Sequence, residues 1–386
     1  MKWNSVALHT CSAAVLLFVG VQAYQTPRVT DDPLPVARQG YLFAGGIYST
    51  VNGQQVMTGH LYAEYRIPLK QTHPWPIVMI PGACCSGTDF TGTPDGREGW
   101  AQFFVRQGYA VYVVDPVGRG RAAYQTAVYG ATAGPGIEGV QRFFVATERY
   151  KLWPQAHLHT QWPGSGAPGD PFFDQFYASV LPSIADATVT QTLNRDAILA
   201  LVEKIGPAIM LTHSQSAAFG WLVADVRPDM VKGLIGVEPN GPPFVDISVV
   251  GQPNWFRDSA TRSRPWGLTA IPLRYAPAVG AASDLEIVRE ETAAGPDLSR
   301  CWLQKSAPRL LPNLGKVPIL VLTAEASYHA AYDHCTVRYL DQAGVHPTFV
   351  KLADVGIRGN GHMLMLEKNN FEIAGVISTW LETTLR

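Results

Sequence analysis

The hydrophobic positions of this chain fall into two patterns. Apolar and polar residues alternate from Tyr41 to Tyr65 around a break at Asn52-Gly53, which predicts an antiparallel hairpin. Farther along, apolar residues form short unbroken runs, which are typical of strands buried on both faces. These runs cover residues 76–80, 110–115, 206–212, 233–238, 318–323 and 348–352.

Stretches that suit helices lie between these buried runs and after the last of them. They cover residues 100–107, 193–204, the segment that follows Ser214, 333–343 and 371–385. Apolar strands that alternate with helices imply a mostly parallel sheet with helices on both faces, here behind an antiparallel start. The sequence therefore predicts an α/β fold, in which ligands bind at the carboxyl ends of the strands.

Two long segments interrupt the regular pattern. Residues 122–190 are rich in glycine, proline and aromatic side chains, and residues 239–317 carry many prolines together with Trp255 and Trp266. Long irregular segments are usually functional lids or disordered linkers, and the aromatic content argues against disorder. We therefore expect two lid insertions within a single domain that covers residues 24–386.

Composition and the N-terminal segment narrow the class of protein. The chain has 386 residues, is 47% hydrophobic and carries a formal net charge of −1. A large core is therefore expected, and neither nucleic acid nor an anionic membrane surface is indicated as a partner. Lys2, the apolar run 13–21 and the small-residue site at Ala23 form the pattern of a secretory signal at residues 1–23. No later segment could span a membrane, so we expect a secreted protein.

The strongest chemical signal lies in residues 206–221. The apolar run there ends at Thr212, Ser214 follows within two residues, and small residues then open a helix. This is the strand, sharp turn and helix of a nucleophile elbow, with Thr212 and Ser216 at the flanking positions where glycine is usual. The frame also fits Ser216 as the nucleophile. Ser214 lies directly at the strand end and is the predicted nucleophile.

A serine nucleophile needs a base, and the base needs an acid that orients it. His362 follows the last predicted strand, and its place after the serine matches one of the known triad orders, so it is the predicted base. Glu325 and Asp333 follow a later strand, in the usual place for the acid. Glu238 ends the strand after the nucleophile helix, where a buried carboxylate needs a partner such as an imidazole. From the residues alone, any of these three carboxylates could be the acid that orients His362.

A serine nucleophile that attacks a carbonyl also needs two backbone N–H donors for the oxyanion of the tetrahedral intermediate. One is expected from Gln215, the residue after the nucleophile, and the other from the glycine-rich turn at residues 81–87. Ala83, Cys84 and Cys85 are the candidates in that turn.

Together these motifs resemble the α/β-hydrolase fold, and most closely a group of secreted-type esterases with adjacent cysteines at the oxyanion hole. The matching segments are residues 82–87, 93–97, 118–121, 213–216, 237–239 and 359–363, within residues 62–382 and outside both insertions. The group's triad acid is a glutamate on the strand after the nucleophile helix, which implies Glu238 beside Ser214 and His362. This chain has Pro81 where the group usually has histidine, and its cysteine pair comes one residue later than in bacterial members. Its long second insertion is closer to that of fungal members.

Four cysteines remain once Cys11 leaves with the predicted signal, and export keeps thiols oxidised. Cys301 and Cys335 are the non-adjacent pair, and we predict a disulfide between them. We also predict a bond between Cys84 and Cys85, a feature of the group that this chain resembles. Neighbouring Cα atoms are about 3.8 Å apart, short of the roughly 4.4–6.8 Å usual for a disulfide. Such a bridge would be strained, but it would hold the oxyanion turn rigid.

The sequence thus predicts a secreted serine esterase that cleaves carboxylic esters, or lactones, through an acyl-enzyme on Ser214, with no cofactor and no metal. The aromatic insertions predict a small-molecule substrate with an apolar or aromatic part. A metal hydrolase would use His157 with His159, or His329 with His334, and neither pair has an acidic partner at ligand spacing. A non-catalytic binding module stays open, as do acyl transfer, cyclisation or lyase chemistry on the same triad. A homodimer also stays open.

Overall fold

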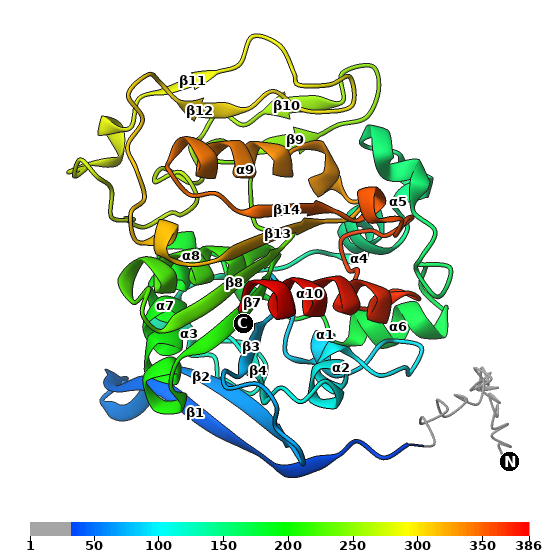
Figure 1. The fold of residues 1–386 in the computed structure, drawn as a ribbon, viewed down its shortest axis with the longest axis vertical. Helices are drawn as coiled ribbons and strands as arrows, with labels where there is room; N and C mark the ends of the chain where they lie inside the picture. The colour runs from blue at the N-terminus through cyan, green and yellow to red at the C-terminus, as the bar shows by residue number, and fades with distance from the viewer. Residues whose placement is uncertain (1–31, 386) are drawn as a thin grey trace, which may run out of the picture.

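An eight-stranded sheet organises the protein, whose computed structural model describes residues 32–385 (Figure 1). The strand order is β1-β2-β4-β3-β7-β8-β13-β14. The first two strands pair antiparallel with each other, β2 pairs antiparallel with β4, and all other neighbours pair parallel. The predicted α/β fold with a mostly parallel sheet behind an antiparallel hairpin is confirmed. The signal peptide predicted at residues 1–23 lies outside the described residues.

The bounds of the sheet strands agree closely with the predicted apolar runs. They are β1 (Val36–Val51), β2 (Gln54–Pro68), β3 (Ile77–Ile80), β4 (Val111–Asp115), β7 (Ala208–His213), β8 (Val231–Val237), β13 (Ile319–Thr323) and β14 (Thr348–Lys351).

Helices cover both faces of this sheet (Figure 1). The longer ones are α2 (Trp100–Arg106), α7 (Ala187–Ile205), α8 (Ala217–Val226), α9 (Asp333–Gln342) and α10 (Asn370–Thr384). The short elements beside them are α1 (Thr88–Thr91), η3 (Ser214–Ser216), η6 (Tyr328–Ala331) and η7 (Leu352–Val355). Within the described part of the chain, no helix is both long and apolar enough to cross a bilayer.

The unbroken apolar runs are explained by this double cover. Successive side chains of a strand point to opposite faces, and in β3 Val78 and Ile80 join the core on the side of α7 and α8. Ile77 and Met79 join the core on the side of α2 and α10. All four side chains are fully buried, and burying each contributes about 1.5–3 kcal/mol to stability. A polar side chain on either face of such a strand would lose its contacts with water at a cost in free energy. The runs therefore contain almost no polar residues.

Helix α7 begins six residues earlier than its apolar periodicity predicts. The side chain of Asp186 caps the helix by accepting the N–H groups of Thr188 and Val189 at 2.7 and 2.9 Å. A cap of this kind satisfies donors that have no partner inside the helix. The capped first turn is polar, so the predicted start at Leu193 was wrong. The first insertion therefore covers residues 122–186.

Both insertions fold onto the α/β core. The first contains α3 (Thr126–Tyr129), β5 (Thr132–Ala133), α4 (Ile137–Val140), η1 (Gln141–Val145), α5 (Thr147–Tyr150), η2 (Pro154–Leu158), α6 (Pro171–Ala178) and β6 (Ser183–Ile184). The second, residues 239–317, contains β9 (Ile247–Val249), β10 (Phe256–Asp258), η4 (Ala282–Asp284), β11 (Ile287–Arg289), β12 (Trp302–Gln304) and η5 (Leu314–Lys316). Its two ribbons lie beyond α9 in Figure 1. Phe173 of the first insertion and Phe244 of the second are buried in the two core clusters.

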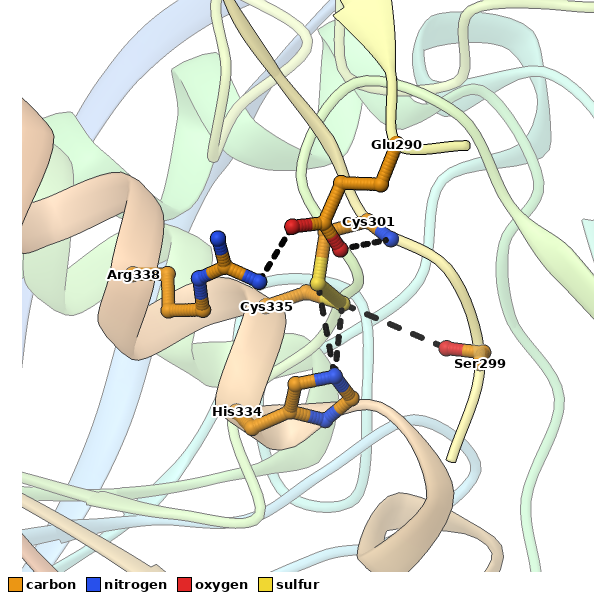
Figure 2. Close-up of a disulfide and its surroundings, with 6 residues drawn as sticks. All are labelled: Glu290, Ser299, Cys301, His334, Cys335 and Arg338. Atoms are coloured by element: carbon orange, nitrogen blue, oxygen red, sulfur yellow. Dashed lines mark hydrogen bonds and ion pairs between the residues drawn. A yellow bond between two sulfur atoms is a disulfide. The ribbon is translucent and has the colours of Figure 1, made fainter. Parts of the chain in front are cut away.

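Cys301 and Cys335 form the predicted disulfide, which is confirmed and ties the second insertion to α9 (Figure 2). Both cysteines are fully buried. The Nε2 atom of His334 lies 3.4 and 3.5 Å from the two sulfur atoms. Glu290 accepts the backbone N–H of Cys301 at 3.0 Å and forms an ion pair with Arg338 of α9. The crosslink and this ion pair fasten the same two segments.

Removing this disulfide should lower the free energy of unfolding substantially. The bond closes a loop with a sequence separation of 34 residues, for which the loss of unfolded-state entropy corresponds to about 3–4 kcal/mol. We expect urea unfolding of a Cys301→Ser/Cys335→Ser variant to show that decrease. A reducing agent should destabilise the native protein by a similar amount and leave the variant unaffected. Equal midpoints for the two proteins without reductant would contradict the expectation.

Candidate active site

The side chains with predicted chemical roles gather at the carboxyl ends of four neighbouring parallel strands. Ser214 follows β7, Glu238 follows β8, and His362 comes after β14, while the loop after β13 lies between the last two. Because adjacent parallel strands end at the same edge of a sheet, segments far apart in sequence meet there.

Ser214 occupies a strained turn between β7 and α8. Its φ of 53° lies in the left-handed region, which is uncommon for a residue other than glycine and is typical of a nucleophile elbow. Ser214 is partly exposed, and its carbonyl oxygen accepts the N–H of Asn240 at 3.0 Å. Ser216, the alternative nucleophile, is fully buried. Its Oγ accepts the N–H of His213 at 2.9 Å and donates to the carbonyl of Ile80 at 2.7 Å, which holds the turn closed.

Glu238 is the acid that the structure places against His362. The Nδ1 atom of His362 lies 2.6 Å from Oε2 of Glu238, and both side chains are buried. Ser327 Oγ donates to the same carboxylate at 2.6 Å, and the N–H of Ala324 donates at 2.9 Å. When this carboxylate is ionised it can only accept hydrogen bonds, so Nδ1 then carries the imidazole proton and Nε2 has a lone pair.

The other two candidate acids have different partners. Asp333 accepts a hydrogen bond from Nδ1 of His329 at 2.9 Å and another from Thr323 Oγ1 at 2.6 Å. Glu325 pairs with Arg358 at 2.6 Å, away from the imidazole of His362. The structure thus pairs His362 with Glu238 next to the elbow, where the ring centroids of His213 and His362 are 4.5 Å apart. A second histidine–carboxylate pair, His329 with Asp333, lies beside them.

Burial determines the protonation of this site. Burial, together with the nearby His213 and His329, holds the pKa of His362 well below its usual value. Its imidazole is therefore neutral at neutral pH, as a general base must be. Burial and the neighbouring Asp333 raise the pKa of Glu238, whereas its hydrogen bonds from Ser327 and Ala324 act in the opposite direction.

Sequence reasoning missed Tyr328, which touches the reacting end of His362. Its hydroxyl lies 3.3 Å from Nε2, and the two ring centroids are 4.9 Å apart. The first insertion adds Phe144, whose ring stacks on His362 at 5.3 Å, and Phe143, whose ring meets Tyr328 edge-on at 5.8 Å. Its position in the sequence could have indicated it, because Tyr328 lies in the loop after β13, where Glu325 was considered as the acid.

The turn that should supply the second oxyanion donor lies against the elbow. A Cβ on Gly82 would be 3.0 Å from Cβ of Ser214, so the two backbones are in close approach. Arg119, which is buried, donates to the carbonyl groups of Gly82 and Cys85 and so holds the turn from behind. Segment 118–121, one of those that carry the resemblance, therefore supports the turn through Arg119.

The bond predicted between Cys84 and Cys85 is not formed in the structure. Both residues are buried free cysteines. The spacing of neighbouring Cα atoms, about 3.8 Å, is too short for an unstrained disulfide, and separate thiols avoid that strain. Cys84 was also expected to donate its N–H to the oxyanion. In the structure that N–H donates to Ser183 Oγ of the first insertion at 2.8 Å. Ala83, which follows Gly82, is partly exposed.

The loop that carries His362 is fastened to the first insertion through a buried ion pair. Glu367 accepts the N–H of Gly361 at 2.9 Å and the side-chain amide of Asn360 at 2.7 Å, and it lies 2.6 Å from Nε2 of His159. Burial lowers the pKa of His159, but Glu367 and Glu148 outweigh this and raise it to about 9. His159, considered above as a metal ligand, is therefore a cation that holds this loop.

Two groups of side chains in the described part of the chain have the proximity of metal ligands. The first is Cys301, His334 and Cys335, but its two sulfur atoms are bonded to each other and offer no thiolate. The second is Glu238, His329 and His362, where Nδ1 of each histidine is already bonded to a carboxylate. The donor sets therefore fit a hydrogen-bonded site better than a metal centre.

Comparisons with known proteins agree with this architecture. No family model matches the chain. A protein of Fungal sp. (strain ATCC 74256), named "Probable secreted lipase phiG", is 43% identical over 343 residues, which are 89% of this chain and 89% of that protein. A solved structure described as a novel bacterial esterase aligns with a TM-score of 0.62 and 21% identity, over 94% of this chain and 100% of that chain. The latter likeness concerns the fold.

Proposed function

This chain belongs to the α/β-hydrolase family together with the protein named "Probable secreted lipase phiG", and we propose that it is a secreted esterase that cleaves carboxylic esters through an acyl-enzyme on Ser214. The observation that carries the proposal is the 2.6 Å contact between His362 and Glu238 beside the strained elbow of Ser214. A neutral base held by a buried acid, next to a hydroxyl presented at a strand end, is what acyl transfer to serine requires.

The first chemical step follows from these positions. His362 accepts the proton that Ser214 loses as Oγ attacks the ester carbonyl, and Glu238 stabilises the imidazolium that forms. The imidazolium then supplies a proton to the departing alcohol. Water enters against His362 in the second half of the reaction, and the same groups release the acid and restore Ser214.

The oxyanion of each tetrahedral intermediate needs two N–H donors. We assign one to Gln215, the first residue after the nucleophile. We assign the other to Ala83 instead of Cys84, because the N–H of Cys84 is bonded to Ser183 and Ala83 adjoins the close contact between Gly82 and Ser214. Losing one donor of this kind costs about 10²–10³ in kcat.

The substrate class is inferred from the walls of the site. Phe143 and Phe144 of the first insertion pack on Tyr328 and His362, so an ester bound here meets aromatic rings beside the reacting carbonyl. We therefore assign esters, including cyclic esters, with an apolar or aromatic part. The test is turnover of p-nitrophenyl esters of increasing acyl length, aryl esters and lactones, with the Ser214→Ala protein as the blank. A native protein no faster than this blank on every substrate would reject the function.

The pH dependence of kcat/KM should have its acidic limb well below pH 6.5. The base must be neutral to act, and the lowered pKa of His362 keeps it neutral into acidic solution. The lowered pKa of His362 also makes the free energy of unfolding depend on pH. Its contribution to stability is fully present above the pKa of histidine in the unfolded chain, about 6.5, and is lost as the pH falls below that value. Initial rates from about pH 4 to 9, with tryptophan fluorescence as a check on folding, measure the limb. A midpoint at or above pH 6.5 in folded protein would contradict the burial argument.

A further inference from the structure

The turn after β3, residues 81–87, lies between two other loops. In the sheet order β4-β3-β7 these strands are parallel, so the loop after β4 is on one side of the turn and the nucleophile elbow is on the other. From the first side, Nη1 of Arg119 donates to the carbonyl groups of Gly82 and Cys85, the latter at 3.1 Å. On the second side, a Cβ on Gly82 would lie 3.0 Å from Cβ of Ser214. A guanidinium therefore holds the turn on the side away from the nucleophile.

This contact sets the direction of one peptide group. The bond between Gly82 and Ala83 is trans, and in a planar trans peptide the C=O and N–H groups point in opposite directions. Because the carbonyl of Gly82 points to Arg119, the N–H of Ala83 points away from it, toward the side of β7. Within residues 32–385 this N–H has no hydrogen-bond acceptor. It is a free donor on the side of the nucleophile.

The other contacts of the turn do not reach this peptide group. The N–H of Cys84 donates to Ser183 Oγ at 2.8 Å, and the carbonyl of Cys84 accepts the N–H of Leu181 at 2.9 Å. The N–H of Gly87 donates to the carboxylate of Asp115 at 2.7 Å. These bonds fasten the second half of the turn to the first insertion and to the end of β4. Among the side chains that the structure describes, the guanidinium is the one that bonds to the peptide group considered above.

The guanidinium forms a strong hydrogen bond because it is charged and shielded from water. Arg119 is 4% exposed, and hydrogen bonds from an ionised donor are stronger than those between neutral groups, most of all where water is excluded. Such a bond resists rotation of the peptide group, so the N–H of Ala83 keeps one direction. A donor that is fixed before the reaction stabilises a developing oxyanion without a cost of reorganisation.

We propose that Arg119 is a positioning residue that fixes the N–H of Ala83 as the second oxyanion donor of the esterase reaction proposed above, on which this inference rests. As Ser214 Oγ forms its bond to the ester carbonyl carbon, the carbonyl π electrons move onto oxygen, and the N–H of Ala83 donates a hydrogen bond to that oxygen. Arg119 stays behind the turn, gives up no proton and does not touch the substrate. It acts only through the peptide group that it holds.

A merely structural role would give a different result. If Arg119 only stabilised the turn, its loss would lower the amount of folded enzyme and reduce the rates on all substrates by one common factor. Sulfur is a weaker hydrogen-bond acceptor than oxygen, so an ester gains more from the donor than the thionoester, in which sulfur replaces the carbonyl oxygen. The ratio of these two rates therefore reports the oxyanion donor and not the amount of enzyme.

The experiment compares the native protein with Arg119→Met, Arg119→Lys and Arg121→Met on a p-nitrophenyl ester and its thionoester. We expect Arg119→Met to lower kcat on the ester about 10–100-fold, which is less than the loss of an entire oxyanion donor, with KM changed less than about threefold. The ratio of the ester rate to the thionoester rate should fall about 10-fold. Arg119→Lys keeps a charged donor and should recover part of both losses.

Arg121→Met is the matched control, because Arg121 is a second arginine of the same segment that bonds to carboxylates instead of the carbonyl groups of the turn. Its Nε lies 2.7 Å from Asp115 and its Nη1 lies 2.6 Å from Glu64, and its side chain is exposed. Ion pairs of exposed side chains contribute little, so kcat should stay within about threefold of the native value. The rate ratio should not change.

A measurement on the native protein tests the donor without these variants. Ser214 Oγ adds to the carbonyl carbon of a trifluoromethyl ketone and leaves a negatively charged oxygen in the place of the ester oxyanion. In protein labelled with ¹⁵N at alanine, we expect the amide proton of Ala83, assigned by its loss in Ala83→Ser, to shift downfield when this adduct forms. An unshifted Ala83 signal in the adduct, a native rate ratio in folded Arg119→Met, or an equal fall of the ratio in Arg121→Met would each overturn the inference. Native turnover in Ser214→Ala would instead overturn the proposed function.

Discussion

Replacing Ser214 with alanine is expected to lower kcat for ester hydrolysis by about 10⁴–10⁶-fold, because the members of a triad act as a unit and the acyl-enzyme cannot form without Oγ. The fold should persist, since the hydrogen bond that Ser214 gives the turn comes from its carbonyl, which accepts the N–H of Asn240. The substitution should not stabilise the protein by relieving backbone strain, because alanine at a φ of 53° is as strained as serine. Initial rates on a p-nitrophenyl ester and covalent labelling by a fluorophosphonate measure the loss.

Ser216→Ala is the matched control for this experiment. Ser216 Oγ is buried and bonded to the backbone of His213 and Ile80, so it cannot reach an ester. Its loss should cost about 1–3 kcal/mol of stability by leaving buried polar groups without a partner, while labelling at Ser214 continues. Labelling that persists in Ser214→Ala and disappears in folded Ser216→Ala would move the nucleophile to Ser216.

The second large effect is expected from Glu238→Gln, which should lower kcat by about 10²–10⁴-fold. Glutamine keeps the shape of the side chain but removes the negative charge that stabilises the imidazolium, and its amide can present a donor to Nδ1 and so favour the wrong tautomer of His362. The effect should fall on kcat more than on KM, because the charge matters most once the imidazole is protonated.

Asp333→Asn separates Glu238 from the other carboxylate of the site. Asp333 accepts hydrogen bonds from His329 and Thr323 and, within the described residues, forms none with His362, so its replacement should reduce stability and leave most of the activity. Steady-state rates and urea unfolding of both variants test the assignment. An inactive, folded Asp333→Asn beside a fully active Glu238→Gln would show that Asp333 is the acid.

The histidine loop explains why part of the site depends on the first insertion. The carboxylate of Glu367 accepts a hydrogen bond from the N–H of Gly361 and pairs with the cationic His159, while Arg97 donates to the carbonyl of Glu367 at 3.1 Å. Two of the segments that carried the resemblance, 93–97 and 359–363, are therefore linked through Glu367. The first insertion thus supplies both the aromatic rings that pack on His362 and Tyr328 and an anchor for the loop that carries His362.

Much of the fold could be predicted from sequence because its signals are local. The unbroken apolar runs mark strands that are buried on both faces, and the break at Asn52-Gly53 marks the hairpin between β1 and β2. The start of α7 was missed because it depends on a polar cap at Asp186 and not on an apolar face. Ser214 and His362 could be singled out because strand ends can be counted along the chain.

Tertiary structure decided which groups touch. Glu238, Glu325 and Asp333 all follow strand ends, and only the spatial order β7-β8-β13-β14 and the hydrogen bonds of each carboxylate select Glu238 as the partner of His362. The contact between Tyr328 and Nε2 has no sequence pattern, because it depends on how one loop packs against another and against Phe143 and Trp153. The sequence by itself determined the strands and the residue types at their ends. The partner of each side chain is a property of three-dimensional packing, since residues more than a hundred positions apart become neighbours only when the sheet has formed.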